Sequence, residues 1–225
     1  LAEKKGPDLI IGGLRKILVE TTKAARRKVS ELPDGTFRQP IFMDTVGPES
    51  ALIKLNIELQ KKGETIKLNL KDTSPMIPDR PLNTFFQGVL GLTMVYFCGW
   101  FFYNLPANNA LLDVLEWEFP PNTLVNAAGD TPTAQSPFVQ VAYSHGIFHI
   151  GAKLTYGYDP LRAVASWYHG FGFGVFGGLN QWGEPIADIT PEMNATACGA
   201  RSDMDGADTA GSFFATMSDC SDVET

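Results

Sequence analysis

Two histidines four residues apart are the first candidates for chemistry in this sequence. His145 and His149 fall in a segment with helical spacing, so both imidazoles would project from one face, where they could bind a metal ion. The residues between them lack the glutamate of the metalloprotease pattern, and a third ligand would have to come from Asp159 or His169. The spacing therefore favours the alternative, partly buried histidines that bond to backbone carbonyls.

A glycine-rich stretch offers a second kind of site. Residues 172–177 match the spacing G-x-G-x-x-G of dinucleotide-binding loops, which need a strand before them and a helix after them. The residues that follow include Gly178, Gly183 and Pro185 and make a poor helix start. We expect glycines packed between aromatic rings here, and no bound nucleotide.

Three aspartates stand close together further along the chain. Asp203, Asp205 and Asp208 carry enough carboxylate oxygens for a divalent cation, but their spacing departs from the EF-hand loop, whose last ligand is a distant glutamate. A solvated turn, in which the carboxylates accept hydrogen bonds from local amides, is the favoured explanation. Asp203 and Asp205 stay candidates for a substrate pocket, because such a loop could line a cleft.

Asparagines bracket the most apolar part of the sequence. They could cap helices and form turns, or they could bind a small neutral or carbonyl-bearing molecule in an apolar pocket, and the two interpretations are equally supported. The residues concerned are Asn83, Asn104, Asn108, Asn109, Asn122 and Asn126. No serine, histidine and acid triad can be assigned, because the fold assembles such triads from distant residues.

The segments that must position these side chains come in blocks of strands and helices. Helical spacing and a start at Pro7-Asp8 predict a first helix. A proline at position 40 predicts that the strand containing it lies at the edge of a sheet. Alternation of apolar and polar residues in the next two segments predicts a hairpin with one buried face. This order indicates an α+β fold with a mixed sheet, whose antiparallel hairpin packs against long helices. The expected elements are helices 7–30, 84–105 and 134–155, and strands 36–45, 52–59, 65–70 and 111–119.

Charge and composition exclude several classes of protein. The net charge is −7, and fifteen of the 18 lysines and arginines lie in residues 1–80, where a basic run (23–28) predicts a solvated helix face or a subunit contact. No recognition motif accompanies it, so we expect no nucleic-acid binding. The apolar stretch 89–103 is too short to span a membrane and predicts a buried core helix. Three cysteines without metal spacing (Cys98, Cys198 and Cys220) favour unpaired thiols in the cytoplasm.

The collinear order of several short segments resembles the hydantoinase B family. These segments are Leu32-Pro-Asp-Gly35, the hairpin, Asp72-Thr-Ser-Pro75, Arg80-Pro-Leu-Asn83, Leu105-Pro-Ala-Asn108, residues 120–126, 199–206 and 222–224. Within that family the chain is most similar to the acetone or acetophenone carboxylase branch. The resemblance spans nearly all 225 residues, and we expect residues 1–225 to be one region, the central to carboxyl-side portion of a larger subunit.

The resemblance implies an activity and a set of partners. The chain would belong to the large catalytic subunit of an ATP-dependent ketone carboxylase. Its partner would be a hydantoinase A-type subunit that handles ATP and Mg, and the complex could contain a small third subunit. An ATP-dependent cyclic amide (lactam) hydrolase of the hydantoinase or oxoprolinase type is the alternative. The resemblance also implies a divalent metal, manganese being one candidate, in a part of the subunit outside this segment, so it assigns no metal ligand to His145 or His149.

Two roles are then open for this chain. It could form a wall of the substrate cavity and a partner interface, or it could be a scaffold that docks the ATP-handling subunit through its basic first helix. For the cavity role the candidate pocket residues are Asn83, Asn108, Asn109, His145, Asp203 and Asp205. The sequence identifies no catalytic residue and no substrate.

Overall fold

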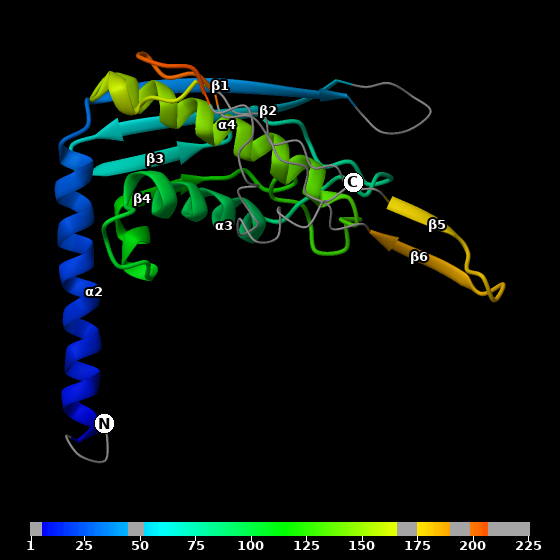
Figure 1. Ribbon diagram of the computed structural model, residues 1–225, viewed down its shortest axis with the longest axis horizontal. Helices are drawn as coiled ribbons and strands as arrows, with labels where there is room; N and C mark the ends of the chain where they lie inside the picture. The colour runs from blue at the N-terminus through cyan, green and yellow to red at the C-terminus, as the bar shows by residue number, and fades with distance from the viewer. Residues whose placement is uncertain (1–5, 45–51, 166–174, 190–198, 207–225) are drawn as a thin grey trace. The chain divides into compact units, whose positions relative to one another are not determined.

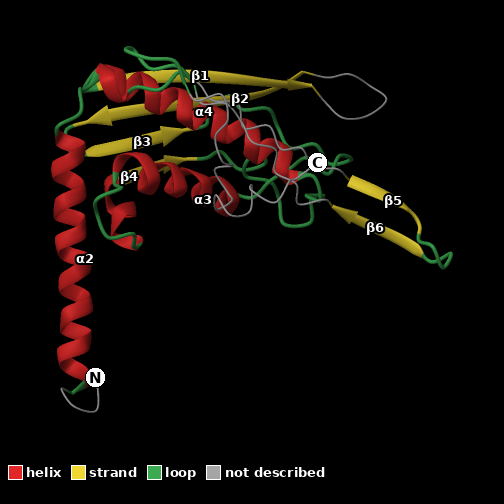
Figure 2. Cartoon of the chain, in the orientation of Figure 1, coloured by secondary structure: helices red, strands yellow, loops and turns green. Residues whose placement is uncertain are grey.

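The computed structural model describes residues 6–44, 52–165, 175–189 and 199–206 (Figures 1 and 2). The chain forms two compact units, Leu1–Pro160 and Leu161–Thr225, and the expectation that both belong to one region of a larger subunit stays a prediction. The first unit contains a four-stranded sheet with its helices, and the second contains a short hairpin. Each unit is described by itself below.

The sheet of the first unit is mixed, which confirms the predicted fold class. Its strand order is β1-β2-β3-β4, with β1 (Gly35–Asp44), β2 (Leu52–Lys62) and β3 (Thr65–Asn69) antiparallel, and β4 (Leu115–Glu118) parallel to β3. The strand predicted over 111–119 is shorter than expected, because Asn109–Val114 forms a 3-10 helix, η2, before it. A parallel neighbour requires a crossover, and residues 70–114 supply it.

The predicted hairpin and edge strand are both confirmed. Leu59 pairs with Leu68 across β2 and β3, and Gly63 turns the chain with a positive φ of 57°. Pro40 of β1 pairs with Asn56 of β2. Because β1 is the edge strand, no further strand lies beside it that would need the N–H group that proline lacks.

The two faces of this sheet differ sharply. One, which we call the covered face, carries apolar residues of β2 and β3 that are 0–2% exposed: Ile53, Leu55, Ile57, Leu59, Ile66 and Leu68. The other, which we call the open face, is mainly polar and charged. Its residues on β1, β2 and β3 are Thr36, Arg38, Pro40, Phe42, Asp44, Leu52, Lys54, Asn56, Glu58, Gln60, Lys62, Thr65, Lys67 and Asn69. Of these, only Glu58 is buried.

Helix α4 (Ser136–Tyr156) lies over β1 and β2 on the covered face (Figure 1). Gly146 allows this approach, since a Cβ there would stand 2.2 Å from Cδ1 of Ile57 and 3.2 Å from Cγ1 of Ile41. The helix begins two residues later than predicted and ends one residue later.

Helix α3 (Phe86–Tyr96) packs against α4 and continues as a π-helical turn, Phe97–Phe101, so it ends before the predicted residue 105. Gly151 of α4 receives the phenol of Tyr96, whose Oη would lie 1.6 Å from a Cβ at that position. Thr93 and Tyr143 share a buried hydrogen bond of 2.6 Å. In the described part of the chain, no helix combines the length and the apolar character needed to span a bilayer.

Helix α2 (Pro7–Ser30) has the predicted bounds. Its carboxyl-terminal half buries Thr21, Ala25 and Val29 and packs against η2 and β3. Its amino-terminal half is exposed along most of its length. The residue before the helix is Gly6, no side chain caps its amino end, and Asp8 lies in the first turn.

The second unit contains an antiparallel hairpin of β5 (Val175–Leu179) and β6 (Pro185–Ile189). Gly183 turns the chain between them with a φ of 78°. Val164 and Arg201 form an isolated bridge in the same unit.

Candidate functional site

His145 and His149 lie one turn apart on α4, and both are half-buried. The Nδ1 atom of His149 is 2.8 Å from the carbonyl oxygen of His145, which confirms the backbone-bonded alternative for His149. Among the described residues, no three histidine, cysteine or acidic side chains gather into a group that could hold a metal. His169 lies outside the described residues, and the pocket role of His145 stays a prediction.

Asn83 is fully buried, and the backbone of its own unit uses its side chain. Its Oδ1 accepts from the N–H of Ile77, and its Nδ2 donates to the carbonyls of Ile77, Arg80 and Pro132 at 2.7–3.0 Å. The amide thereby ties the loop before α3 to the loop before α4. Because every polar atom of the side chain is occupied, Asn83 acts in this structure as a loop anchor, and a contact with substrate stays a prediction.

Asn108 and Asn109 lie at the start of η2, apart from Asn83. Asn108 accepts from the N–H of Ala110 at 3.0 Å, as a helix cap does, and donates to Oγ1 of Thr21 in α2 at 3.1 Å. Asn109 is exposed. Asn108 thus holds α2 against η2, and the pocket role predicted for both residues stays a prediction.

Asp203 and Asp205 of the second unit are exposed to solvent. Asp203 lies 3.6 Å from the guanidinium of Arg201, and the N–H of Arg201 donates to the carbonyl of Met204 at 2.8 Å. Asp208 lies outside the described residues. The exposure of both carboxylates agrees with a solvated segment, while their hydrogen bonds to local amides and the pocket role of Asp203 and Asp205 stay predictions.

The glycine-rich motif is described only from Val175 onward. Val175–Leu179 is strand β5, and the element that follows it is another strand of the same hairpin. A dinucleotide loop needs a helix at that point, so the described part of the motif lacks the required context. Gly172 and Gly174 lie outside the described residues.

An open cavity of about 460 Å³ lies where the amino end of α3 meets β4. We call it the aromatic groove; its lining residues are Phe85, Phe86, Gln87, Trp117, Phe119, Asn126 and Ala127. Three rings form its aromatic wall: Phe86 lies edge-on to Trp117 at 6.2 Å, Phe119 lies 4.9 Å from Phe86, and Trp117 stacks on Phe119 at 5.7 Å. Such ring pairs stabilise one another by about 1 kcal/mol each beyond area burial.

Amide groups stand beside these rings. Asn126 donates from Nδ2 to the carbonyl of Phe119 at 3.0 Å, which holds its side chain in place, while its Oδ1 has no partner in the described chain. Gln87 is exposed and has no partner among the described residues. The amino end of α3 has no side-chain cap; the N–H of Gly88 donates to the carbonyl of Phe85, and the N–H groups of Phe86 and Gln87 have no acceptor among the described residues. Flat rings with a few directional amides suit a small carbonyl-bearing molecule.

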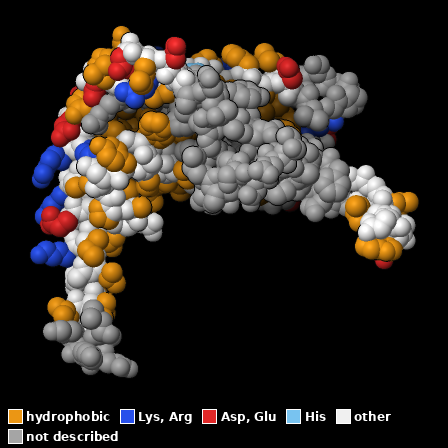
Figure 3. All heavy atoms as spheres, viewed as in Figure 1, with side chains coloured by type: hydrophobic (Ala, Val, Ile, Leu, Met, Phe, Trp, Pro, Cys, Tyr) orange, Lys and Arg blue, Asp and Glu red, His pale blue; other side chains and the backbone are white. Residues whose placement is uncertain are grey.

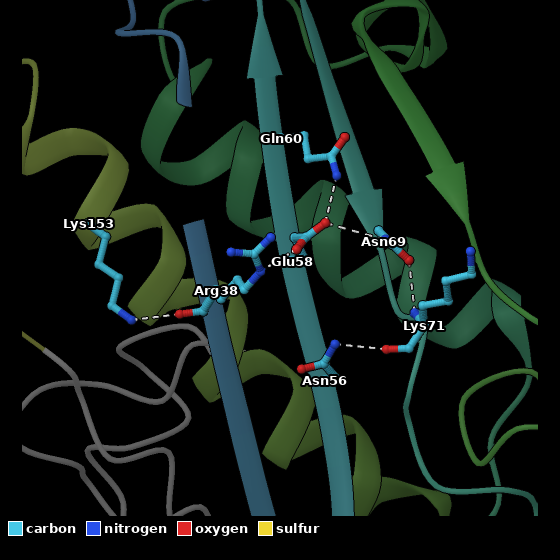
Figure 4. Close-up of polar contacts among 7 residues, drawn as sticks. All are labelled: Arg38, Asn56, Glu58, Gln60, Asn69, Lys71 and Lys153. Atoms are coloured by element: carbon cyan, nitrogen blue, oxygen red, sulfur yellow. Dashed lines mark hydrogen bonds and ion pairs between the residues drawn. The ribbon is translucent and has the colours of Figure 1, made fainter. Parts of the chain in front are cut away.

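The open face carries a polar network centred on Glu58 (Figure 4). Its carboxylate pairs with Arg38 of β1 and accepts from Gln60 at 2.6 Å and from Asn69 at 3.4 Å. Burial raises the pKa of Glu58, but the hydrogen bonds from Gln60 and Arg38 outweigh this effect and hold the pKa below its ordinary value. The carboxylate therefore stays charged and paired, which suits a structural role and not proton transfer.

Comparison with known protein families identifies the family to which the chain belongs. The sequence profile of the hydantoinase B/oxoprolinase family matches residues 1–225. The chain belongs to the hydantoinase B family. The resemblance that the order of short segments indicated is thereby confirmed.

Two relatives show which proteins this hydantoinase B chain is similar to. It is 28% identical to the acetophenone carboxylase delta subunit of Aromatoleum aromaticum over 214 residues, which cover 94% of this chain and 31% of the relative. It is 24% identical to the B-type subunit of a putative D-/L-hydantoinase of Pseudomonas sp. over 143 residues, 59% of this chain and 24% of the relative. The alignments thus span about a third or less of the length of these relatives.

Two solved structures share the fold. Acetone carboxylase in a nucleotide-free form matches with a TM-score of 0.83 at 17% identity, covering 94% of this chain and 30% of that one. An ATP-dependent caprolactamase from Pseudomonas jessenii matches with a TM-score of 0.74 at 16% identity, covering 94% and 36%. The fold of this hydantoinase B chain therefore occurs in part of a larger acetone carboxylase chain.

The aromatic groove is the part of this hydantoinase B chain that the sequence did not reveal. Phe86 and Trp117 are 31 positions apart and share no motif, although Asn126 was among the asparagines that we singled out. The sequence did contain one sign of such a groove, because aromatic residues are concentrated at 85–86 and 117–119, and Asn122 and Asn126 follow the second group. Only the parallel placement of β4 beside β3 brings them together.

Proposed function

We propose that this chain supplies one wall of the substrate cavity in the catalytic subunit of an ATP-dependent ketone carboxylase of the acetone or acetophenone type. The observation that carries the proposal is the 28% identity, over 94% of the chain, to a subunit of acetophenone carboxylase. The proposed substrate is a small ketone. The proposed location of the wall is the aromatic groove.

The composition of the groove supports this assignment. The rings of Phe86, Trp117 and Phe119 give a flat apolar surface for an alkyl or aryl group, and the Nε2 amide of Gln87 can donate to a carbonyl oxygen. The uncapped amino end of α3 favours negative charge, such as that of a carboxylate or phosphate group. An apolar wall also helps to keep a phosphorylated intermediate away from water.

The proposal assigns the remaining chemistry to other parts of a cytoplasmic complex. ATP and Mg²⁺ are placed on a hydantoinase A-type partner, and a small third subunit is compatible with the same arrangement. A divalent metal is placed outside this segment, as the family resemblance implies. The role of this chain is then to bind and orient the ketone and to contact its partner.

A second candidate function is ATP-dependent hydrolysis of a cyclic amide. The shared fold with a caprolactamase and the 24% identity to a subunit of a putative hydantoinase support it. A lactam also presents a carbonyl beside an apolar ring, so the groove alone does not separate the two substrates. A scaffold without a cavity role is the remaining alternative.

Variants of the groove test the proposal in the complete protein with its partner subunits. Phe85 is exposed, and Gln87 has no partner in the described chain, so Phe85→Ala and Gln87→Leu should leave folding and assembly intact. We expect each variant to lower kcat/KM by about tenfold, which corresponds to about 1.4 kcal/mol of transition-state binding. The measurement is ATP-dependent fixation of labelled bicarbonate with acetone and acetophenone, beside ring opening of caprolactam and hydantoin.

Phe42→Ala is the matched control, because Phe42 is an exposed phenylalanine on the open face. Its turnover should equal that of the wild type. Ring opening without bicarbonate fixation would replace the carboxylase assignment by the hydrolase. Unchanged kinetics of both groove variants in an intact complex would remove the cavity role and leave the scaffold.

A further inference from the structure

Thr84 lies just before α3 and makes hydrogen bonds to two other segments of the first unit. Its N–H donates to the carbonyl of Leu124 at 2.8 Å, and its carbonyl accepts from the N–H of Ala127 at 3.1 Å. Its Oγ1 accepts from Nε2 of Gln140, on α4, at 3.1 Å. Thr84 is only 2% exposed, so loss of one of these partners would leave a buried polar group without a hydrogen bond.

The backbone bonds of Thr84 join two of the segments that line the aromatic groove. Residues 85–87 follow Thr84 directly, and residues 126–127 belong to the segment with which it pairs. The other lining residues are Trp117, in β4, and Phe119, just after it. A movement of Thr84 would therefore change how the residues of the groove stand relative to one another.

The bond from Gln140 ties Thr84, and with it the amino end of α3, to α4. Gly88, in the first turn of α3, makes room for this bond, since a Cβ there would stand 2.8 Å from Nε2 of Gln140 and 3.1 Å from Oγ1 of Thr84. Helix α3 itself has no charged residue, and Figure 3 shows hydrophobic side chains gathered over it. Apolar contacts are non-directional, so the hydrogen bond adds a fixed direction at the end of α3 that borders the groove.

We propose that Thr84 is a positioning residue for substrate binding, which holds residues 85–87 and 126–127 of the aromatic groove in place through its bonds to Gln140 and to the segment 124–127. The inference rests on the proposed function in one respect, that the groove binds the carbonyl-bearing substrate. Thr84 is not among the lining residues, so it acts through its neighbours and takes no part in the chemistry. Loss of the Gln140 bond should weaken binding of the organic substrate and leave binding of ATP unchanged.

Steady-state kinetics of Thr84→Val in the complete complex tests the proposal, because valine keeps the branched shape of threonine and lacks the hydroxyl. We expect the KM for the organic substrate to rise about threefold to tenfold, with kcat changed by less than about twofold and the KM for ATP unchanged. Gln140→Met should give a similar rise, and the two substitutions together should raise the KM no further than either alone, since both remove the same bond. Thr84→Ser retains the hydroxyl and should show the wild-type KM.

Thr93→Val is the matched control. Thr93 is also a buried threonine whose hydroxyl bonds to α4, at Tyr143, but it lies about two turns further along α3, away from the groove. Urea denaturation should show a loss of stability for both valine variants, whereas only Thr84→Val should raise the KM. An equal rise in KM for both would indicate a general loosening of the helices and overturn the proposal, as would an unchanged KM for Thr84→Val. If Thr84→Val does not fold, the half-buried Gln140→Met decides by the same criteria.

Amide hydrogen exchange on the same samples separates the inference from the proposed function, because it reports on the groove without turnover. The peptide that contains the N–H of Ala127 should exchange several-fold faster in Thr84→Val than in the wild type or in Thr93→Val. Faster exchange in a complex that turns over neither ketones nor cyclic amides would refute the function and support the hold of Thr84 on the groove. Turnover of ketone with wild-type exchange and wild-type KM in Thr84→Val would refute the positioning role and leave the function standing.

Discussion

The covered and open faces of the sheet come from the same strands but are stabilised by different interactions. Leu55 and Leu59 of β2 point into the helices and are fully buried, while the residues that alternate with them, Lys54 and Glu58, are on the opposite face. On the covered face the chain excludes water with aliphatic side chains. On the open face it keeps polar groups paired at the surface, with one buried carboxylate.

This difference indicates where changes in stability and changes in function should appear. Apolar burial is non-directional and large in sum, whereas exposed ion pairs contribute about 0–1 kcal/mol each. Substitutions on the covered face should therefore lower the free energy of unfolding most. The open face should tolerate substitution, with Glu58 as its most sensitive position.

The largest expected effect is that of Leu55→Ala on the covered face. Removal of a fully buried leucine side chain leaves a cavity and should lower the free energy of unfolding by about 2–5 kcal/mol. Lys54→Ala, at the next position but on the open face, should change it by less than about 0.5 kcal/mol. Urea denaturation of both variants measures the contrast, and equal losses would contradict the division into two faces.

The next effect concerns the helix layer on the covered face. Gly151→Ala forces a methyl group into the ring of Tyr96 and should cost about 1–3 kcal/mol. Gly91→Ala is the control, since a Cβ at Gly91 of α3 meets no atom within 4 Å. That variant should gain up to about 1 kcal/mol from helix propensity. A loss for Gly91→Ala as large as that for Gly151→Ala would argue against the tight contact of α3 and α4.

On the open face, Glu58→Gln should lower the free energy of unfolding by about 1–2 kcal/mol at neutral pH, because it removes charged hydrogen bonds with Arg38 and Gln60. The folded-state pKa of Glu58 is lowered, so the stabilisation is complete above the unfolded-state pKa of about 4.3 and is lost as the pH falls through the folded-state value. The difference between wild type and variant should shrink below about pH 4. A difference that stays constant down to pH 3 would show that Glu58 is not ionised in the network.

The smallest effect is expected for the exposed pair of Lys67 and Glu118, whose charged atoms lie 2.7 Å apart. This contact raises the pKa of Lys67 and lowers that of Glu118. Lys67→Ala should shift the melting temperature only slightly, and the shift should vanish in about 1 M salt. A shift that persists at high salt would mean that the lysine stem packs on the sheet.

Most of the fold could be predicted from the sequence, because its signals are local. The bounds of α2, the hairpin of β2 and β3, and the edge position of β1 follow from helical spacing, alternation and one proline. Two details could not be predicted. The π-helical turn at Phe97–Phe101 and the 3-10 helix before β4 depend on how aromatic and leucine side chains pack against distant segments.

The candidate site was far less predictable. Asn83 and Asn108 were chosen as directional groups for a substrate, and the structure uses both amides to join loops and helices. The run of charges in 23–28 predicted a solvated helix face or a subunit contact; Arg26 and Lys28 bond within the chain, and the subunit contact stays a prediction. In each case the residue type was informative, but its partner was not visible in the sequence.

By itself the sequence determined the order of the main helices and strands of the first unit, the buried side of the hairpin of β2 and β3, and membership of the hydantoinase B family. These properties depend on residues two, three or four positions apart and on the collinear order of short segments. Only the tertiary structure decided that Phe86, Trp117 and Phe119 form one groove. Such sites are made by residues far apart in the chain, whose proximity is set by the packing of β4 and the helices.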